Sequence, residues 1–237
     1  MRVGALYVYP VKACRAVALD VAALGPLGLE HDRRFAFMGE DGVALTQRDQ
    51  PLLATVCPSV EADAVRLSFG GLFEIALAVS DFTQAAKLDV WSKPIPARAA
   101  PEALLAAASD YLGARARLVM LDPAAERSFA DSRLVLVTTT GMLSRLGIPG
   151  IGMERFRPNV VLKGNGEWRE LRGSEAALQY AKPCGRCEVT TIDQTSGARR
   201  GPEPLRTLTE RFAGEFGIYC RVARAGRLRR GEILQAS

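Results

Sequence analysis

The sequence predicts a mainly β protein of the α+β class, with a barrel-like or strongly twisted β-domain at its N-terminal end. Over the first hundred residues, short apolar or alternating runs are separated at close spacing by Gly, Pro and Asp, which is typical of strands joined by tight turns. Near residue 100 the composition changes to strong helix formers, and only a few short helical segments follow. We therefore expect two domains, over residues 1–100 and 101–237.

Four runs in the first half are expected to form strands, at residues 3–9, 16–22, 34–38 and 52–60. Residues 39–42, which begin and end with glycine, predict a turn with hairpin character. Residues 69–72 predict a second turn. The segments on either side of it, residues 65–68 and 74–77, should pair as antiparallel strands.

The second half combines short helices with further strands. Residues 101–112 begin with proline, continue in strong helix formers and end before Gly113, which predicts a helix. Thr138 or Thr139 is expected to cap the next short helix. Residues 204–212 predict another helix, because their apolar residues recur at helical spacing. The remaining strands are expected at residues 117–121, 134–137, 218–222 and 232–234.

Composition excludes several classes of protein. The chain of 237 residues is 48% hydrophobic and 24% charged, which is ordinary for a globular protein. No run of eighteen apolar residues is present, and the N-terminus lacks a signal-peptide layout, so we expect no membrane association. Five cysteines at uneven spacing do not predict a disulfide framework. We therefore expect a cytoplasmic protein.

The net charge of +5 is partly local, because arginines crowd the C-terminal end of the chain at positions 221, 224, 227, 229 and 230. Aromatic residues make up only 7% of the sequence, and none alternates with this basic run to stack on bases. We therefore expect no nucleic acid partner. An acidic electron-donor protein would suit such a surface better.

Cys184 and Cys187 form a C-x-x-C pair that four β-branched residues, 189–192, closely follow. This run predicts a strand that begins at Cys187, whereas a thioredoxin-type dithiol lies at a helix N-terminus. A structural zinc site needs four ligands, and the other Cys and His residues are isolated, at Cys14, His31, Cys57 and Cys220. The pattern favours a single thiolate presented to a large, soft metal, with Cys187 the better ligand because Cys184 should lie in a turn.

Residues 155–163 predict a further strand, in which Arg155, Arg157 and Asn159 share one face. Two guanidinium groups suit phosphate, and an amide both donates and accepts hydrogen bonds. This strand is therefore a candidate wall of a polar cleft.

Six segments in order along the chain carry a set of motifs: YPVKACR at residues 9–15, GLEHDRRF at 28–35, LTQR at 45–48, SFAD at 128–131, RFRPN at 155–159, and KPCGRC at 182–187 continuing to Asp193. Together they resemble the MOSC family, and within it the amidoxime-reducing molybdenum enzymes. One departure is Ala13, where the family usually has serine, so one possible hydroxyl contact to the cofactor is missing.

The resemblance implies a MOSC N-terminal β-barrel-like domain over residues 1–100, packed on a MOSC β-barrel domain with a few short helices. It also implies that Cys187 ligates the molybdenum of a molybdenum cofactor (molybdopterin) and that Asp131 lies close to the metal as a catalytic residue. The residues implied to hold the phosphate and pterin are Lys12, Arg34, Arg157 and Asn159, with Tyr219 as a further contact.

The implied activity is reduction of small N-hydroxylated molecules, such as hydroxylamines and amidoximes. A separate electron-donor protein is expected, because Cys220 is the only cysteine in the last fifty residues and no iron–sulfur motif is present. The alternative is a sulfur-carrier or cofactor-sulfuration module that acts with a pyridoxal-phosphate desulfurase; pyridoxal phosphate itself is not expected on this chain. A non-catalytic zinc-bound interaction module is a third reading.

Overall fold

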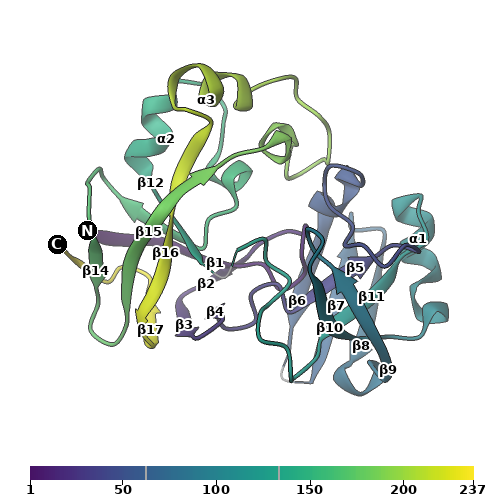
Figure 1. Ribbon diagram of the computed structural model, residues 1–237. Helices are drawn as coiled ribbons and strands as arrows, with labels where there is room; N and C mark the ends of the chain where they lie inside the picture. The colour runs from purple at the N-terminus through teal and green to yellow at the C-terminus, as the bar shows by residue number, and fades with distance from the viewer. Residues whose placement is uncertain (62, 133) are drawn as a thin grey trace.

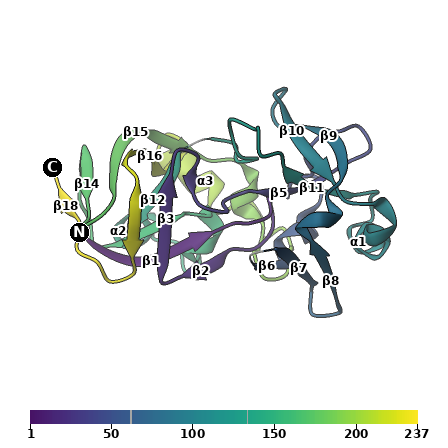
Figure 2. The ribbon, with the colours of Figure 1, turned by 90° about the horizontal axis from the view of Figure 1, so that it is seen from below.

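The computed structural model describes residues 1–61, 63–132 and 134–237. One end of the molecule holds the eight-stranded sheet, with the small sheet that contains residues 226–229 beside it, and the other end holds the remaining two sheets (Figure 1). A perpendicular view shows the same separation (Figure 2). The α+β, mainly β class is therefore confirmed. In the described part of the chain, no helix is long and apolar enough to cross a membrane.

The large sheet combines both ends of the chain. Its strands, in spatial order, are β18 (Gln235–Ala236), β14 (Glu170–Arg172), β15 (Ala177–Gly185), β16 (Glu215–Arg224), β12 (Val135–Thr139), β13 (Val160–Lys163), β1 (Arg2–Val8) and β2 (Val17–Leu19). Only β12 and β13 pair in parallel. The N-terminal strand β1 thus lies among strands from the second half of the chain. The predicted boundary near residue 100 stays a prediction.

The other strands form three smaller sheets. They are β5 (Phe35–Met38), β11 (Arg117–Leu121), β10 (Pro94–Ala99) and β9 (Gln84–Asp89); β17 (Gly226–Arg229), β3 (Val21–Gly25) and β4 (Gly28–Leu29); and β6 (Val56–Val60), β7 (Ala64–Phe69) and β8 (Phe73–Ala78). The expected hairpin is present, with Val65 opposite Leu77 and Ser68 opposite Glu74. Part of the strand expected at residues 52–60 is instead a 3-10 turn, η1 (Pro51–Thr55).

The helices follow their predicted signals closely. They are α1 (Ala106–Leu112), α2 (Thr140–Leu146) and α3 (Leu205–Arg211), with short 3-10 segments η2 (Val79–Asp81), η3 (Glu102–Leu105), η4 (Met153–Phe156) and η5 (Glu188–Thr191). Gly113 ends α1 in the left-handed conformation. Thr139 caps α2, because its hydroxyl accepts a hydrogen bond from Met142 N at 3.0 Å. The strand expected at residues 232–234 is absent; Ile233 makes an isolated bridge to Arg2.

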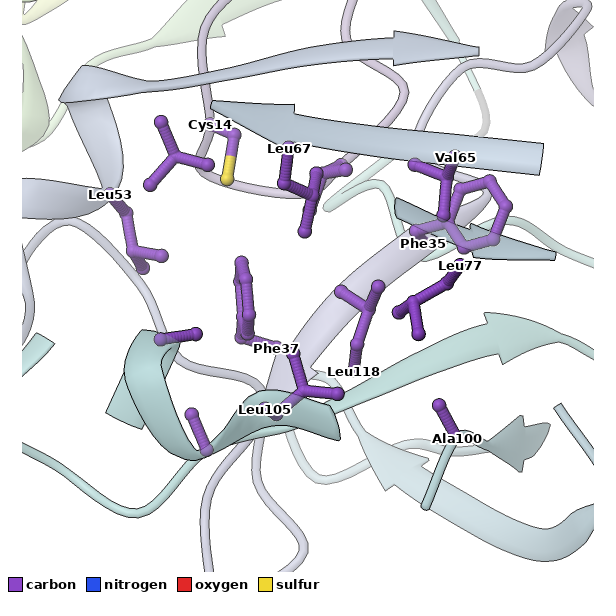
Figure 3. Close-up of a cluster of buried hydrophobic side chains, with 14 of the residues drawn as sticks. Cys14, Phe35, Phe37, Leu53, Val65, Leu67, Leu77, Ala100, Leu105 and Leu118 are labelled. Carbon is purple, nitrogen blue, oxygen red and sulfur yellow. The ribbon is translucent and has the colours of Figure 1, made fainter. Parts of the chain in front are cut away.

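Two main cores lie beneath these sheets. Figure 3 shows one of them, in which Phe35, Phe37 and Leu118 pack against residues of β7, β8 and η3. The other core joins β1 and β3 to β12, β13 and β16. Each fully buried aliphatic or aromatic side chain contributes about 1.5–3 kcal/mol to folding. The two cores therefore provide rigid walls on either side of the segments that connect them.

Gly217 provides a test of the packing between β16 and β12. Its φ is 86°, and a Cβ there would lie 2.9 Å from Leu136 Cδ1 and Thr138 Cγ2. Gly231 has a similar φ of 89° but open space around it. We expect Gly217→Ala to lower the free energy of unfolding by about 2–4 kcal/mol, against about 1–2 kcal/mol for Gly231→Ala, because only the first adds overpacking to backbone strain. Urea unfolding measures both, and equal losses would contradict this packing.

Candidate functional site

A cleft lies where segments of the two halves meet. It is open to solvent and encloses a volume of about 150 Å³. Asp131 is the one carboxylate that lines it among the residues that the structure describes. The lining cationic side chains are Lys12, Arg33, Arg48, Arg157 and Arg186.

Lys12 enters the cleft from the loop that follows β1. Its ammonium group donates to Asp131 Oδ1 at 2.5 Å, and Trp91 Nε1 donates to the same oxygen at 2.9 Å. Burial lowers the pKa of Lys12 below its ordinary value, although Asp131 opposes this shift. Burial raises the pKa of Asp131, but the Lys12 charge and the two hydrogen bonds outweigh it and lower the pKa to about 2. Asp131 is therefore ionised near neutral pH and acts as an acceptor.

Arg34, the arginine predicted to bind the cofactor, does not line this cleft. Its Nη2 lies 3.8 Å from Met120 Sδ. Arg33 lines the cleft instead, with a left-handed φ of 50°. It pairs with Asp32, and its guanidinium lies 4.3 Å from the centre of the Tyr9 ring. The left-handed turn reverses the faces that an extended strand would have, so Arg33 takes the place that we assigned to Arg34.

The strand expected at residues 155–163 begins only at Val160. Residues 153–156 form η4, and Arg157 ends it with a left-handed φ of 51°. Arg155 is therefore buried beneath the cleft, where it donates to Thr190 O at 3.1 Å. Arg157 does line the cleft and lies 4.4 Å from the Tyr9 ring centre. Burial lowers its pKa to about 10, so it stays protonated near neutral pH.

Asn159 lines the cleft, but its amide is already engaged. Its Oδ1 accepts from Leu136 N at 3.2 Å, while Nδ2 donates to Tyr7 O at 3.3 Å and to Asp32 Oδ1 at 3.2 Å. These bonds hold the carboxylate that pairs with Arg33. The described contacts therefore favour a positioning role for Asn159.

The prediction of a strand that begins at Cys187 is also wrong. Cys187 is extended, but the next residues form η5, because Thr190 donates to Cys187 O through both its amide, at 3.1 Å, and its hydroxyl, at 2.9 Å. Hydroxyl side chains compete with strand formation in this way. Cys184 lies in β15 rather than in a turn, and it is fully buried. Cys187 remains exposed at the rim of the cleft.

Tyr219 reaches the cleft from β16, next to Cys184. Burial and then the nearby Cys184 raise its pKa above the ordinary value, so its hydroxyl stays protonated and can donate a hydrogen bond. The predicted residues Lys12, Asp131, Arg157, Asn159, Cys187 and Tyr219 thus all line one cleft, with Arg34 outside it.

An amide pair that the sequence did not predict joins the two halves. Gln47 Nε2 donates to Gln194 Oε1 at 3.0 Å, and Gln194 Nε2 donates back to Gln47 Oε1 at 2.9 Å. Arg157 Nη1 donates to the same Gln194 oxygen at 3.2 Å. Gln47 also donates to the carbonyl of Ala13 at 2.6 Å. Gln47 belongs to the T-Q-R motif, which could have identified it, whereas Gln194 lies outside the motifs.

Two further arginines were also missed. Arg48 Nη1 lies 3.8 Å from Cys187 Sγ. Arg186 donates to Cys184 Sγ and to Phe156 O, each at 2.9 Å, while its buried Nε has no partner among the described groups. The cleft therefore has more cationic donors than acceptors to receive them.

This donor set fits a molybdenum cofactor. Phosphate oxygens accept from guanidinium and ammonium groups, and the uncommitted Arg186 Nε offers one such donor. A soft thiolate is a suitable ligand for a soft metal, and Cys187 exposes its sulfur on the same cleft.

Two family models match this chain. The model described as the MOSC N-terminal beta barrel domain matches residues 1–115, and the model described as the MOSC domain matches residues 126–235. Between them they match most of the chain.

Relatives differ in length and in name. The molybdenum cofactor sulfurase of Drosophila grimshawi is 28% identical over 240 residues, which cover 90% of this chain and 31% of that protein. Mitochondrial amidoxime reducing component 2 of Bos taurus is 26% identical over 273 residues, covering 97% of this chain and 81% of that protein. The chain therefore spans about a third of the sulfurase. The crystal structure of the YUAD protein from Bacillus subtilis covers 98% of this chain, with a TM-score of 0.43 and 12% identity.

The Lys12–Asp131 pair predicts a pH-dependent contribution to stability. Because the folded pKa of Asp131 is about 2, below its ordinary 3.8, this contribution is fully present above about pH 4 and is lost as the pH falls toward 2. We expect Asp131→Asn to be less stable than the wild type at pH 6, with the difference narrowing at lower pH. Urea unfolding at pH 6, 4 and 3 measures it; a difference that does not change with pH would contradict the assignment.

Proposed function

Because this chain belongs to the MOSC family, we propose that it binds a molybdenum cofactor through Cys187 and reduces small N-hydroxylated compounds, such as hydroxylamines and amidoximes. The observation that carries this proposal is the combination of an exposed thiol with five cationic side chains in one cleft. The thiolate would ligate the metal, and the cations would neutralise the phosphate and hold the pterin.

In this proposal, the residues that hold the cofactor come from both halves of the chain. Lys12 and Arg33 come from the first half, and Arg157 and Arg186 from the second. Tyr219 adds a hydroxyl donor that burial keeps protonated. Asn159 and Gln194 support this set from behind, because their amides hold Asp32 and Arg157 in place.

The bound cofactor would supply the electron transfer. Reduction of an N–OH group to N–H takes up two electrons and two protons and releases water, so the site must also provide protons. With a pKa of about 2, Asp131 is a poor proton donor near neutral pH. We therefore assign it the role of holding the Lys12 ammonium and the Trp91 indole at the mouth of the cleft. Lys12, whose pKa burial lowers, is the better candidate for delivering a proton.

A separate protein is the proposed source of electrons, and the cytoplasm remains the predicted location.

The main alternative is sulfur transfer. The similarity to the MOSC region of molybdenum cofactor sulfurases supports it, and an exposed Cys187 next to Arg48 could also carry a persulfide. Molybdenum content separates the two: stoichiometric metal supports the reductase, whereas metal-free protein that accepts sulfur at Cys187 supports the alternative.

Removal of the proposed ligand is the first test. We expect Cys187→Ser, produced in a molybdopterin-competent host, to lose its molybdenum and its amidoxime reduction with an external electron donor, because serine lacks the soft thiolate. Cys184→Ser should lose much less. Cys57→Ser, a half-buried thiol outside the cleft, is the matched control. Equal metal content and turnover in wild type and Cys187→Ser would refute the ligand assignment.

The second test concerns cofactor retention. A charge-assisted hydrogen bond contributes about 1.5–3 kcal/mol, and about 1.4 kcal/mol is tenfold in affinity. Arg157→Ala should therefore weaken cofactor binding by about one to two powers of ten. Arg157→Lys should rescue it only partly, because an ammonium group lacks the planar fork. Molybdopterin content after gel filtration is the readout, with the exposed Arg229→Ala as control. Full retention by a folded Arg157→Ala would place the phosphate clamp elsewhere.

A further inference from the structure

Neither the backbone geometry of its turn nor packing in a core explains why a tryptophan occurs at position 91. It lies at the tip of the β9–β10 hairpin with 58% of its surface exposed. Trp91 and Ser92 have φ values of 58° and 57°, as in a tight hairpin turn that favours Asn and Gly at both positions. A bulky side chain in this left-handed conformation is strained.

The indole is instead engaged with the cleft. Its Nε1 donates to Asp131 Oδ1 at 2.9 Å, and the Arg48 guanidinium lies 4.6 Å from the ring centre. Asp131 and Arg48 both line the cleft, and Arg48 Nη1 is 3.8 Å from Cys187 Sγ. A single guanidinium therefore separates the indole from the thiol at the mouth of the site.

We propose that Trp91 determines substrate specificity by forming an aromatic wall at the entrance. It would select uncharged substrates in which the reacting N–O group is attached to a planar aryl system. The aryl ring would pack against the exposed part of the indole. Arg48, which lies beside the indole, repels cationic substrates, and Asp131 already accepts two hydrogen bonds and is not free to pair with one. This inference rests on the proposed function, because it names the substrate class of the same site.

A purely structural role for Trp91 leads to a different expectation. If the indole only latched the hairpin to Asp131, its removal would destabilise the fold. If it is retained for substrate binding, Trp91→Gly should leave the thermal midpoint unchanged or higher, because glycine adopts this φ without strain. Trp91→Phe keeps an aromatic ring but loses the N–H group, and it therefore separates stacking from hydrogen bonding.

The experiment compares benzamidoxime with acetamidoxime on the molybdenum-loaded protein and an external electron donor. For Trp91→Gly we expect KM for benzamidoxime to rise about threefold to tenfold, with KM for acetamidoxime and both kcat values little changed. Trp91→Phe should retain most of the preference for the aryl substrate. Leu72→Ala, which removes another exposed side chain (77%) in the turn between β7 and β8, is the control. Equal rises in both KM values, or a Trp91→Phe variant that behaves like Trp91→Gly, would overturn the proposal.

A binding measurement tests the wall independently of turnover. Benzamide and acetamide are titrated separately against wild type and Trp91→Phe, and the difference in tryptophan fluorescence isolates Trp91 without altering the buried Trp168. Saturable quenching by benzamide and not by acetamide supports the wall, even if neither amidoxime is reduced and the proposed function fails. Identical, non-saturating quenching by the two amides overturns the wall, even if amidoxime reduction is confirmed.

Discussion

The antiparallel pairing of β1 with β13 determines where the cleft forms. It brings Leu6 opposite Val160 and Arg2 opposite Lys163, and Tyr7 N donates to Asn159 O at 2.8 Å. This ladder places the first strand of the chain in a sheet built mainly from its second half. The segment that leaves β1 and the segment that enters β13 consequently run side by side. Lys12 and Arg157 reach the same cleft for this reason, although they are far apart in sequence.

The second constraint is the charge of the cleft. Five cationic groups and one carboxylate line it in the described part of the chain, and like charges in a partly desolvated space destabilise one another. Burial is the main reason why the pKa values of Lys12 and Arg157 are lowered, and the positive charge of Arg33 adds a smaller contribution. An anionic ligand would offset this destabilisation. In the proposed function, the phosphate of the cofactor would be that ligand.

The two halves hold this site in different ways. The eight-stranded sheet presents Arg157, Cys187 and Tyr219 on or beside its strands. Arg33 and Arg48 line the cleft from the segments before and after β5, and Trp91 lies in the turn between β9 and β10. The reciprocal bonds between Gln47 and Gln194 join the halves directly. In the proposed function, a substrate would enter between a cofactor held beside the large sheet and an entrance formed by loops. Loops of this kind are where specificity is most readily altered.

The sequence by itself determined the features that depend on neighbouring residues. The hairpin around residues 69–72, the Thr139 cap and the Gly113 stop each rest on backbone preferences within a few positions. The motifs also identified Lys12, Asp131, Arg157, Asn159, Cys187 and Tyr219, which share one cleft. Their roles there stay proposals.

Only the tertiary structure decided which side chains turn toward the cleft. The left-handed backbone at Arg33 and Arg157, the 3-10 segment after Cys187 and the Gln47–Gln194 pair were not expected from local sequence. The extended and left-handed conformations of a residue differ in free energy by only a few kcal/mol. Contacts with segments more than a hundred positions away can supply that difference. Periodicity counts residues along one strand, and it carries no information on such contacts. That is why neither periodicity nor the motif that suggested Arg34 revealed the roles of Arg33 and Trp91.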